Sequence, residues 1–310
     1  MEMREFANIV KNNLQEHLGT NVTIRENAIM KNNNLVLTGL ALIPQNSNIG
    51  PTIYLNGYLD KYENGWATIS DIVTDIINIY NNSTPHHFDV DHFFDFSKIK
   101  SKIIFKLISY GRNKELLEGV PYIPYLDFAI VFQVLIDDLS DNNSTASILI
   151  RNEHTLMWKS TIRDLYDAAL ENTPKLQPCS ITSMNDVILE MMKTEHNISD
   201  EEVVNILNNI YSAEQPQMYV LSNKNKINGA ACLLYPRVLD DFAEKINSDF
   251  YVLPSSLHEC ICIPASFDMD VEHLLEMVRE VNETQVEQED LLTDSVYFYS
   301  KQKSILEKVA

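Results

Sequence analysis

Residues 218–282 constrain the fold more than any other stretch, because they hold the densest apolar runs in the chain. Asn228 and Gly229 separate the first two runs, and both residue types accept the positive φ angles of a tight hairpin turn. Residues 260–263 are apolar at every position, which is typical of a strand covered on both faces. The pattern predicts strand, strand, helix, strand, strand, helix, at residues 218–222, 230–235, 238–246, 250–253, 260–263 and 271–281.

Both helices of this stretch have recognisable sequence signals. Apolar residues recur with helical spacing across residues 238–246 and form one stripe. Asp270 is expected to be the N-cap of the last helix, with Glu272 in its first turn, where the helix dipole favours a carboxylate. We therefore predict an α/β protein of the α+β type, with mixed or antiparallel sheets, packed helices and a C-terminal β-β-α-β-β-α unit.

The rest of the chain is expected to form two further regions, with boundaries that can merge into one or two domains. These are an N-terminal α/β region at 1–98 and central strands followed by helices at 99–215, which leaves 216–310 for the C-terminal unit. Other expected elements are a helix at 4–18, strands at 21–24 and 35–42, a helix at 52–62 capped by Gly65, strands at 103–110, 128–136 and 295–299, and a helix at 301–309.

Several segments spread over the chain resemble one protein family. They are PTIYLNGYLDKYENG (51–65), WKSTIRDLYDAALENTPKLQP (158–178), YVLSN, NGAACLLYP, FYVLPSSLHE, EMVREVNETQV and LLTDSVYFYSK. Together they are similar to the uncharacterised domain-of-unknown-function family 5688, which occurs in anaerobic gut Firmicutes. The resemblance implies membership of that family and carries no activity or site residues with it.

The chain is strongly acidic, with 44 acidic and 24 basic residues and a formal net charge of −20 at pH 7. Affinity for nucleic acid comes mainly from Lys and Arg that neutralise phosphates, so no direct nucleic-acid binding is expected. A basic protein is the partner that such a surface favours. An alternative is an acidic DNA mimic or inhibitor, which requires carboxylates arrayed along one face.

The positions of the cysteines and the hydropathy of the chain indicate in which cellular compartment the protein resides. Three of the four cysteines, at 232, 260 and 262, lie in apolar runs, where a free thiol behaves as a small buried hydrophobic group. No apolar run approaches the roughly 20 residues that span a bilayer. The N-terminal residues lack the basic and apolar regions of a signal peptide. We therefore expect a cytoplasmic protein that does not enter a membrane.

One segment combines imidazole and carboxylate groups in a way that suits a divalent metal. Three histidines and three aspartates fall within ten residues, although no recognised ligand spacing such as HExxH is present. The alternative interpretation is a solvated polar linker whose phenylalanines dock against the fold. The candidate ligands are His86, His87, Asp89, Asp91, His92 and Asp95.

A second segment carries the residue types of a hydrolase. Ser255, Ser256, His258 and Glu259 place hydroxyls, an imidazole and a carboxylate close together in sequence. No GxSxG elbow is present, and a turn in which the serines bond to the backbone is the competing interpretation. No cofactor is predicted, because the chain lacks a P-loop, a GxGxxG motif and other glycine-rich phosphate cradles.

Three functions remain open from the sequence. The first is an accessory or interaction protein without enzymatic activity that contacts a basic partner. The second is a hydrolase, either metal-assisted through residues 86–95 or using Ser256 and His258. The third is the DNA mimic.

Overall fold

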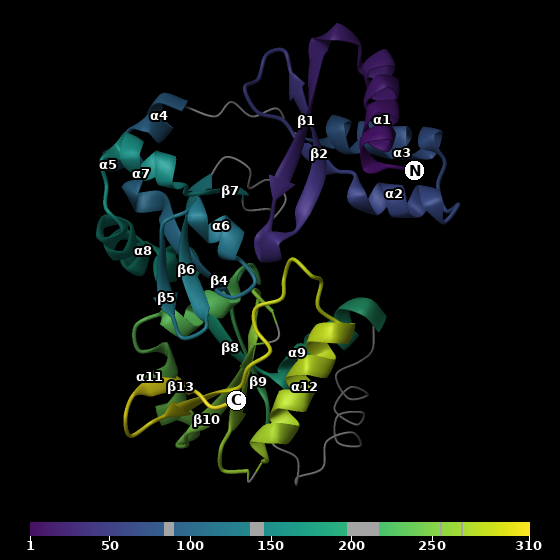
Figure 1. Ribbon diagram of the computed structural model, residues 1–310. Helices are drawn as coiled ribbons and strands as arrows, with labels where there is room; N and C mark the ends of the chain where they lie inside the picture. Colours follow the sequence, from purple (N-terminus) through teal and green to yellow (C-terminus); the bar gives the residue numbers. More distant parts are fainter. Residues whose placement is uncertain (84–89, 137–145, 197–216, 255, 268) are drawn as a thin grey trace. The chain divides into compact units, whose positions relative to one another are not determined.

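The computed structural model describes residues 1–83, 90–136, 146–196, 217–254, 256–267 and 269–310. They form antiparallel sheets with packed helices, which confirms the predicted α+β class. The chain divides into two compact units, Met1–Lys98 and Ile99–Ile136 with Ser147–Ala310 (Figure 1). Within these ranges, no helix is both long enough and apolar enough to cross a membrane.

The first unit is a three-stranded antiparallel sheet, in the order β1-β2-β3, with three helices on one side of it (Figure 1). A short helix follows, and 3-10 turns flank β1. The elements are α1 (Met3–Leu18), β1 (Val22–Met30), β2 (Val36–Pro44), β3 (Thr52–Tyr54), α2 (Asn56–Glu63), α3 (Ile69–Asn82) and α4 (Val90–Phe94).

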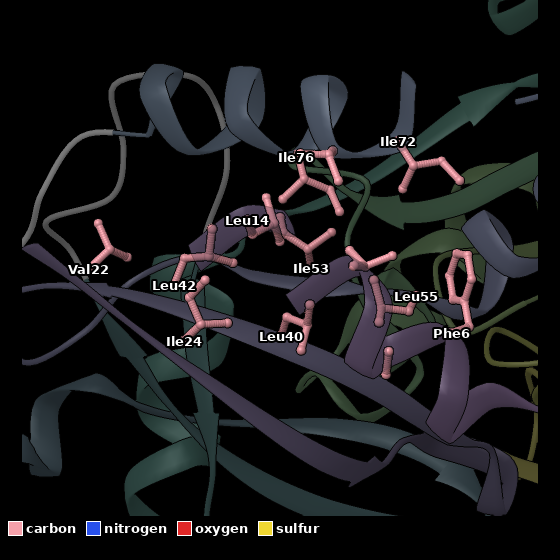
Figure 2. Close-up of a cluster of buried hydrophobic side chains, with 13 residues drawn as sticks. Phe6, Leu14, Val22, Ile24, Leu40, Leu42, Ile53, Leu55, Ile72 and Ile76 are labelled. Atoms are coloured by element: carbon pink, nitrogen blue, oxygen red, sulfur yellow. The ribbon is translucent and has the colours of Figure 1, made fainter. Parts of the chain in front are cut away.

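The core of this unit follows directly from the periodicity of its elements. Phe6, Val10 and Leu14 lie on one face of α1, as residues four apart on a helix must, and all three are fully buried. Ile24 of β1 lies opposite Leu42 of β2, so both side chains point to the same face of the sheet. Figure 2 shows the helical and strand side chains of this core pointing toward one another.

The second unit contains a smaller sheet in the order β4-β6-β5, with β7 paired to β6. Helix α8 packs on β4, and the Thr173 hydroxyl accepts a hydrogen bond from the Phe105 backbone N–H at 3.1 Å. Helix α5 (Phe96–Ile99) spans the boundary between the units along the chain. The elements that follow are β4 (Ile103–Ser109), α6 (Lys114–Glu118), β5 (Tyr122–Tyr125), β6 (Phe128–Ile136), β7 (Ala146–Leu149), α7 (Asn152–Trp158) and α8 (Ile162–Leu176).

A six-stranded sheet completes the second unit, in the order β13-β12-β10-β11-β9-β8. Its strand pairs are antiparallel, and β8 joins it from well upstream of the C-terminal stretch. The elements are β8 (Cys179–Ser183), α9 (Met184–His196), β9 (Tyr219–Asn223), the 3-10 helix η5 (Gly229–Leu234), α11 (Val238–Ile246), β10 (Phe250–Pro254), β11 (Cys260–Pro264), α12 (Val271–Thr284), β12 (Tyr297–Ser300) and β13 (Ile305–Lys308).

One strand of the predicted β-β-α-β-β-α unit is wrong: residues 230–235 do not form the second strand of a hairpin. The turn signal is real, since Asn228 has φ 55°, but the chain then enters η5. Gly229 packs so closely on β9 that a Cβ there would lie 2.7 Å from the Asn223 backbone nitrogen. This backbone contact turns the chain away from the sheet edge, and β11 pairs with β9 instead.

Two predicted helices are also corrected. Residues 52–54 pair with β2 as a third strand, so the helix predicted at 52–62 begins only at Asn56. Residues 305–308 form β13 rather than part of a helix at 301–309, because Ser304 (φ 51°) closes a hairpin with β12. A short terminal helix gains little from propensity alone, whereas the strand satisfies its backbone groups against β12.

Candidate functional site

A cleft in the first unit lies between α2, α3 and the turn that joins them. It has a volume of about 330 Å³. Its lining combines two aromatic side chains, one ammonium and two carboxylates with two aliphatic side chains. The lining residues are Tyr58, Lys61, Trp66, Ala67, Asp71, Ile72 and Asp75. We call this the Trp66 cleft.

Trp66 is the most unusual residue of the cleft, because 78% of it is exposed. Tryptophan is a large apolar side chain that is normally mostly buried in a monomeric fold. The second tryptophan of the chain, Trp158, follows this rule and is 7% exposed. An exposed tryptophan beside a cleft is a common feature of binding surfaces.

The backbone holds Trp66 in place through the end of α2. Gly65 adopts φ 72°, its N–H donates to the Tyr62 carbonyl at 3.1 Å, and the Trp66 N–H donates to the Lys61 carbonyl at 2.8 Å. These two bonds form a Schellman motif, in which the residue after the glycine turns back toward the last helical turn. Gly65 therefore caps α2, as its sequence position predicted, and the Trp66 backbone turns back toward Lys61.

The start of α3 fixes the other end of the turn. Thr68 is the N-cap, its hydroxyl accepts a hydrogen bond from the Asp71 N–H at 3.2 Å, and the Asp71 carboxylate accepts from the Thr68 N–H at 2.9 Å. The hydrogen bond from the Thr68 hydroxyl lowers the pKa of Asp71, so this carboxylate stays charged. Only Trp66 and Ala67 separate the two motifs, which leaves little freedom in the connection.

The remaining polar groups of the cleft are arranged around Tyr58. Its hydroxyl donates to the Asp75 carboxylate at 2.6 Å, and the Lys61 ammonium lies 5.4 Å from the centre of its ring. Burial and the hydrogen bond to Asp75 raise the pKa of Tyr58 to about 12, so it remains a donor at neutral pH. The cleft therefore already places one cation over an aromatic face, next to a carboxylate.

Only part of the predicted metal segment falls on described residues. His86, His87 and Asp89 lie outside them, whereas Asp91 and His92 lie on α4 and are exposed. Asp95 accepts hydrogen bonds from the backbone N–H and hydroxyl of Ser97, at 3.0 and 2.7 Å, and the hydroxyl bond lowers its pKa. Among the described residues, no group of three or more His, Cys, Asp or Glu is placed to hold a metal ion. The metal site thus stays a prediction.

In the predicted hydrolase segment, Ser255 lies outside the described residues, and the ring of His258 is used by other partners. Its Nδ1 accepts a hydrogen bond from the Asn228 N–H at 3.2 Å, so Nε2 carries the proton and donates to Asp290 at 3.1 Å. The Ser256 hydroxyl accepts from the His258 backbone N–H at 3.0 Å. The histidine therefore ties two loops together, and neither ring nitrogen contacts Ser256.

The other members of this segment support the same loop. Glu259 is half-buried, and its carbonyl accepts a hydrogen bond from the Ser256 N–H at 3.3 Å. Asp290, which the sequence did not identify, lies thirty-two residues from His258 and comes next to it only through folding. The Leu257 N–H donates to the Asp290 carbonyl at 2.8 Å, which holds the pair in place.

A second cluster that the sequence did not reveal surrounds Asp127, in the turn between β5 and β6. Its carboxylate accepts hydrogen bonds from Thr293 and Ser295, both at 3.0 Å, from Lys308 at 3.2 Å and from the Tyr297 hydroxyl. Burial raises the pKa of Asp127, but the bonds from Tyr297, Ser295 and Lys308 outweigh it and hold the pKa below its usual value. Because both oxygens of the carboxylate accept hydrogen bonds from within the fold, we assign this cluster a structural role.

Comparison with known proteins identifies the family. The model of a family of unknown function, DUF5688, matches residues 3–301 of the 310. The chain belongs to this family. No curated protein and no solved structure matches it. The membership confirms the resemblance found in the sequence, while the interpretation of the Trp66 cleft depends on its own geometry.

Proposed function

We propose that this member of the DUF5688 family is an interaction protein that binds a basic polypeptide segment, with a lysine or arginine side chain held in the Trp66 cleft. The observation that carries the proposal is the 78% exposure of a tryptophan held by backbone hydrogen bonds at the rim of a cleft with carboxylates. The free thiols and the acidic surface suit a protein of the bacterial cytoplasm, the compartment we propose for it.

A cation is the ligand that the chemistry of the cleft favours. Aromatic faces attract ammonium and guanidinium groups, with about 0.5–1 kcal/mol per exposed contact. Two carboxylates, Asp71 and Asp75, face one ammonium, Lys61, so the charged lining groups sum to −1. The position of Lys61 over Tyr58 indicates where an incoming cation would bind, with Lys61 displaced into solvent.

A polypeptide is favoured over a small amine by the charge of the whole chain. A net charge of −20 attracts a polybasic partner over a distance of about a Debye length, whereas a single ammonium gains little from it. The long-range field would then bring the partner to the surface, and the Trp66 cleft would select one side chain.

The proposal is tested by calorimetric titration with a short lysine–serine peptide whose ends are blocked. Trp66→Ala should weaken binding about 5- to 30-fold, which corresponds to about 1–2 kcal/mol for an aromatic contact at an interface. Leu156→Ala is the matched control, because Leu156 is 79% exposed and lies in the other unit. Equal affinity of the Trp66→Ala variant and the unaltered protein would show that binding is due to overall charge, and would overturn the proposal.

Two variants that change the charge of the cleft test whether its ligand is a cation or an anion. Asp75→Asn should weaken binding about 2- to 5-fold, as expected for one exposed carboxylate. Lys61→Met should strengthen binding, because it removes the ammonium that occupies the face of Tyr58. If Lys61→Met instead weakens binding while Asp75→Asn strengthens it, the cleft prefers an anion and the proposed partner is wrong.

A further inference from the structure

A group of thiols lies on one face of the six-stranded sheet, in the unit that does not contain the Trp66 cleft. In the strand registers, Cys179 of β8 is opposite Asn223 of β9, while Cys260 and Cys262 of β11 are opposite Leu221 and Tyr219. Residues two apart on a strand point to the same face, so the three cysteines share a face of the sheet. The fourth cysteine, on η5, covers this face.

The fourth cysteine, Cys232, contacts Cys179 directly. Cys232 Sγ donates a hydrogen bond to the Ser222 carbonyl oxygen at 3.2 Å, and Ser222 adjoins Asn223, the β9 residue opposite Cys179, so the two thiols lie next to each other. The Cys232 proton can therefore bond to the carbonyl while Cys179 is a thiol, and to the Cys179 sulfur when that sulfur is ionised. All four cysteines are free in the structure.

Of these thiols, only Cys179 can be reached from solvent. Cys232, Cys260 and Cys262 are fully buried, whereas Cys179 is half-buried and lines a cavity of about 240 Å³. The other lining residues are Ile181, Val238, Asp241, Phe242 and Lys245. The lining thus combines apolar side chains with two charged groups of α11, Asp241 and Lys245.

The hydrogen bond from Cys232 also changes the acidity of both thiols. It lowers the pKa of Cys179, against the opposing effect of burial. The same interaction with Cys179, together with burial, raises the pKa of Cys232. One thiol of the pair is therefore the better nucleophile while the other keeps its proton, which is the asymmetry that thiol exchange requires.

We propose that Cys179 is a thiol–disulfide exchange site for small aliphatic disulfides that enter this cavity, and that Cys232 resolves the mixed disulfide. In the first step the Cys179 thiolate attacks one sulfur of the disulfide, the S–S bond of the reagent breaks, and one small thiolate leaves and takes a proton from water. In the second step Cys232 gives its proton to the second leaving thiolate and attacks the Cys179 sulfur. Two protein thiols are oxidised to one disulfide, and one small disulfide is reduced to two thiols.

The second step is helped by a change that the first step makes. Once Cys179 is bonded to another sulfur it carries no charge, so the largest cause of the raised pKa of Cys232 is gone and only burial remains. The buried thiol then becomes a better nucleophile next to an electrophilic sulfur. Formation of the mixed disulfide on Cys179 therefore favours the attack by Cys232 that resolves it.

The test is exposure of the native protein to hydroxyethyl disulfide, followed by mass spectrometry of the intact chain and of its peptides. The unaltered protein should lose two hydrogen atoms and yield a peptide pair linked through Cys179 and Cys232. Cys232→Ala should stop at one bound half-reagent on Cys179. Cys179→Ser should lose all modification in the folded state.

Cys260→Ala is the matched control, because Cys260 is as fully buried as Cys232 but shares no hydrogen bond with Cys179. It should give the same internal disulfide as the unaltered protein. Peptide mapping of the unaltered chain needs no variant, so this result does not depend on whether the substituted proteins fold. Modification of Cys260 or Cys262 first, or a mixed disulfide on Cys179 that is never resolved, would overturn the proposal.

Discussion

Replacement of Asp127 by alanine should destabilise the second unit more than any other single removal of a surface carboxylate. Tyr297 is fully buried, and its hydroxyl would lose its carboxylate acceptor, which costs about 1–3 kcal/mol for an unsatisfied buried donor. The bonds from Thr293 and Ser295 are to a charged group and add to this loss. The Lys308 ion pair adds little, because the two side chains are 45% and 31% exposed.

The expected total is about 3–5 kcal/mol in the free energy of unfolding, from one unsatisfied buried donor and two lost hydrogen bonds to a charged acceptor. Urea denaturation followed by the fluorescence of Trp158 measures it, in a Trp66→Phe background so that only the second unit is observed. Asp167→Ala is the control, since Asp167 is 62% exposed and pairs with Arg163 at 3.7 Å. A loss below about 1 kcal/mol for Asp127→Ala, equal to that of the control, would refute the structural role of this cluster.

A second variant, Asp127→Asn, tests the dependence of this stabilisation on pH. The folded-state pKa of Asp127 lies below its unfolded value, so its stabilisation is complete above the unfolded pKa of about 3.9 and is lost as the pH falls through the folded value. The stability difference between the unaltered protein and Asp127→Asn should therefore be constant near neutral pH and close in acid. A difference that grows on acidification would contradict the sign of the shift.

Further substitutions examine local features of the fold. Gly229→Ala should cost about 1–3 kcal/mol, because its Cβ would collide with backbone atoms of β9 and the His258 carbonyl, whereas Gly57→Ala on α2 meets nothing within 4 Å and should be neutral or stabilising. Thr161→Ala should cost about 1 kcal/mol through loss of the hydrogen bond that its hydroxyl accepts from the Asp164 N–H at 3.2 Å. Urea denaturation checks both, and equal stability of the two glycine variants would contradict the close packing of η5.

Sequence patterns predicted the fold where local physics decides the structure. The apolar stripe of residues 238–246 forms α11 with those bounds, and Asp270 caps α12 by accepting a hydrogen bond from the Glu272 N–H. Residues 230–235 and 301–309 were mispredicted because their conformation is decided by packing on β9 and pairing with β12. Such contacts join residues from different elements, and no local pattern encodes them.

The candidate site was less predictable than the fold. Its local signals were present, since Gly65 and the Thr68–Asp71 pair mark the end of one helix and the start of the next. The exposure of Trp66 could not be read from them, because tryptophan in an apolar context usually joins the core. The link between Asp75 and Tyr58 crosses from α3 to α2, and only the packing of the two helices brings it about.

The most direct test of the account is the fluorescence of Trp66 in a Trp158→Phe chain, in which Trp66 is the sole tryptophan. Titration with the blocked lysine–serine peptide should shift and saturate the Trp66 emission, at a midpoint that Asp75→Asn moves to higher peptide concentration. A blocked glutamate–serine peptide should leave the emission unchanged. Binding heat from the lysine peptide with no change in Trp66 emission would place the ligand elsewhere on the acidic surface and contradict the proposed role of the Trp66 cleft.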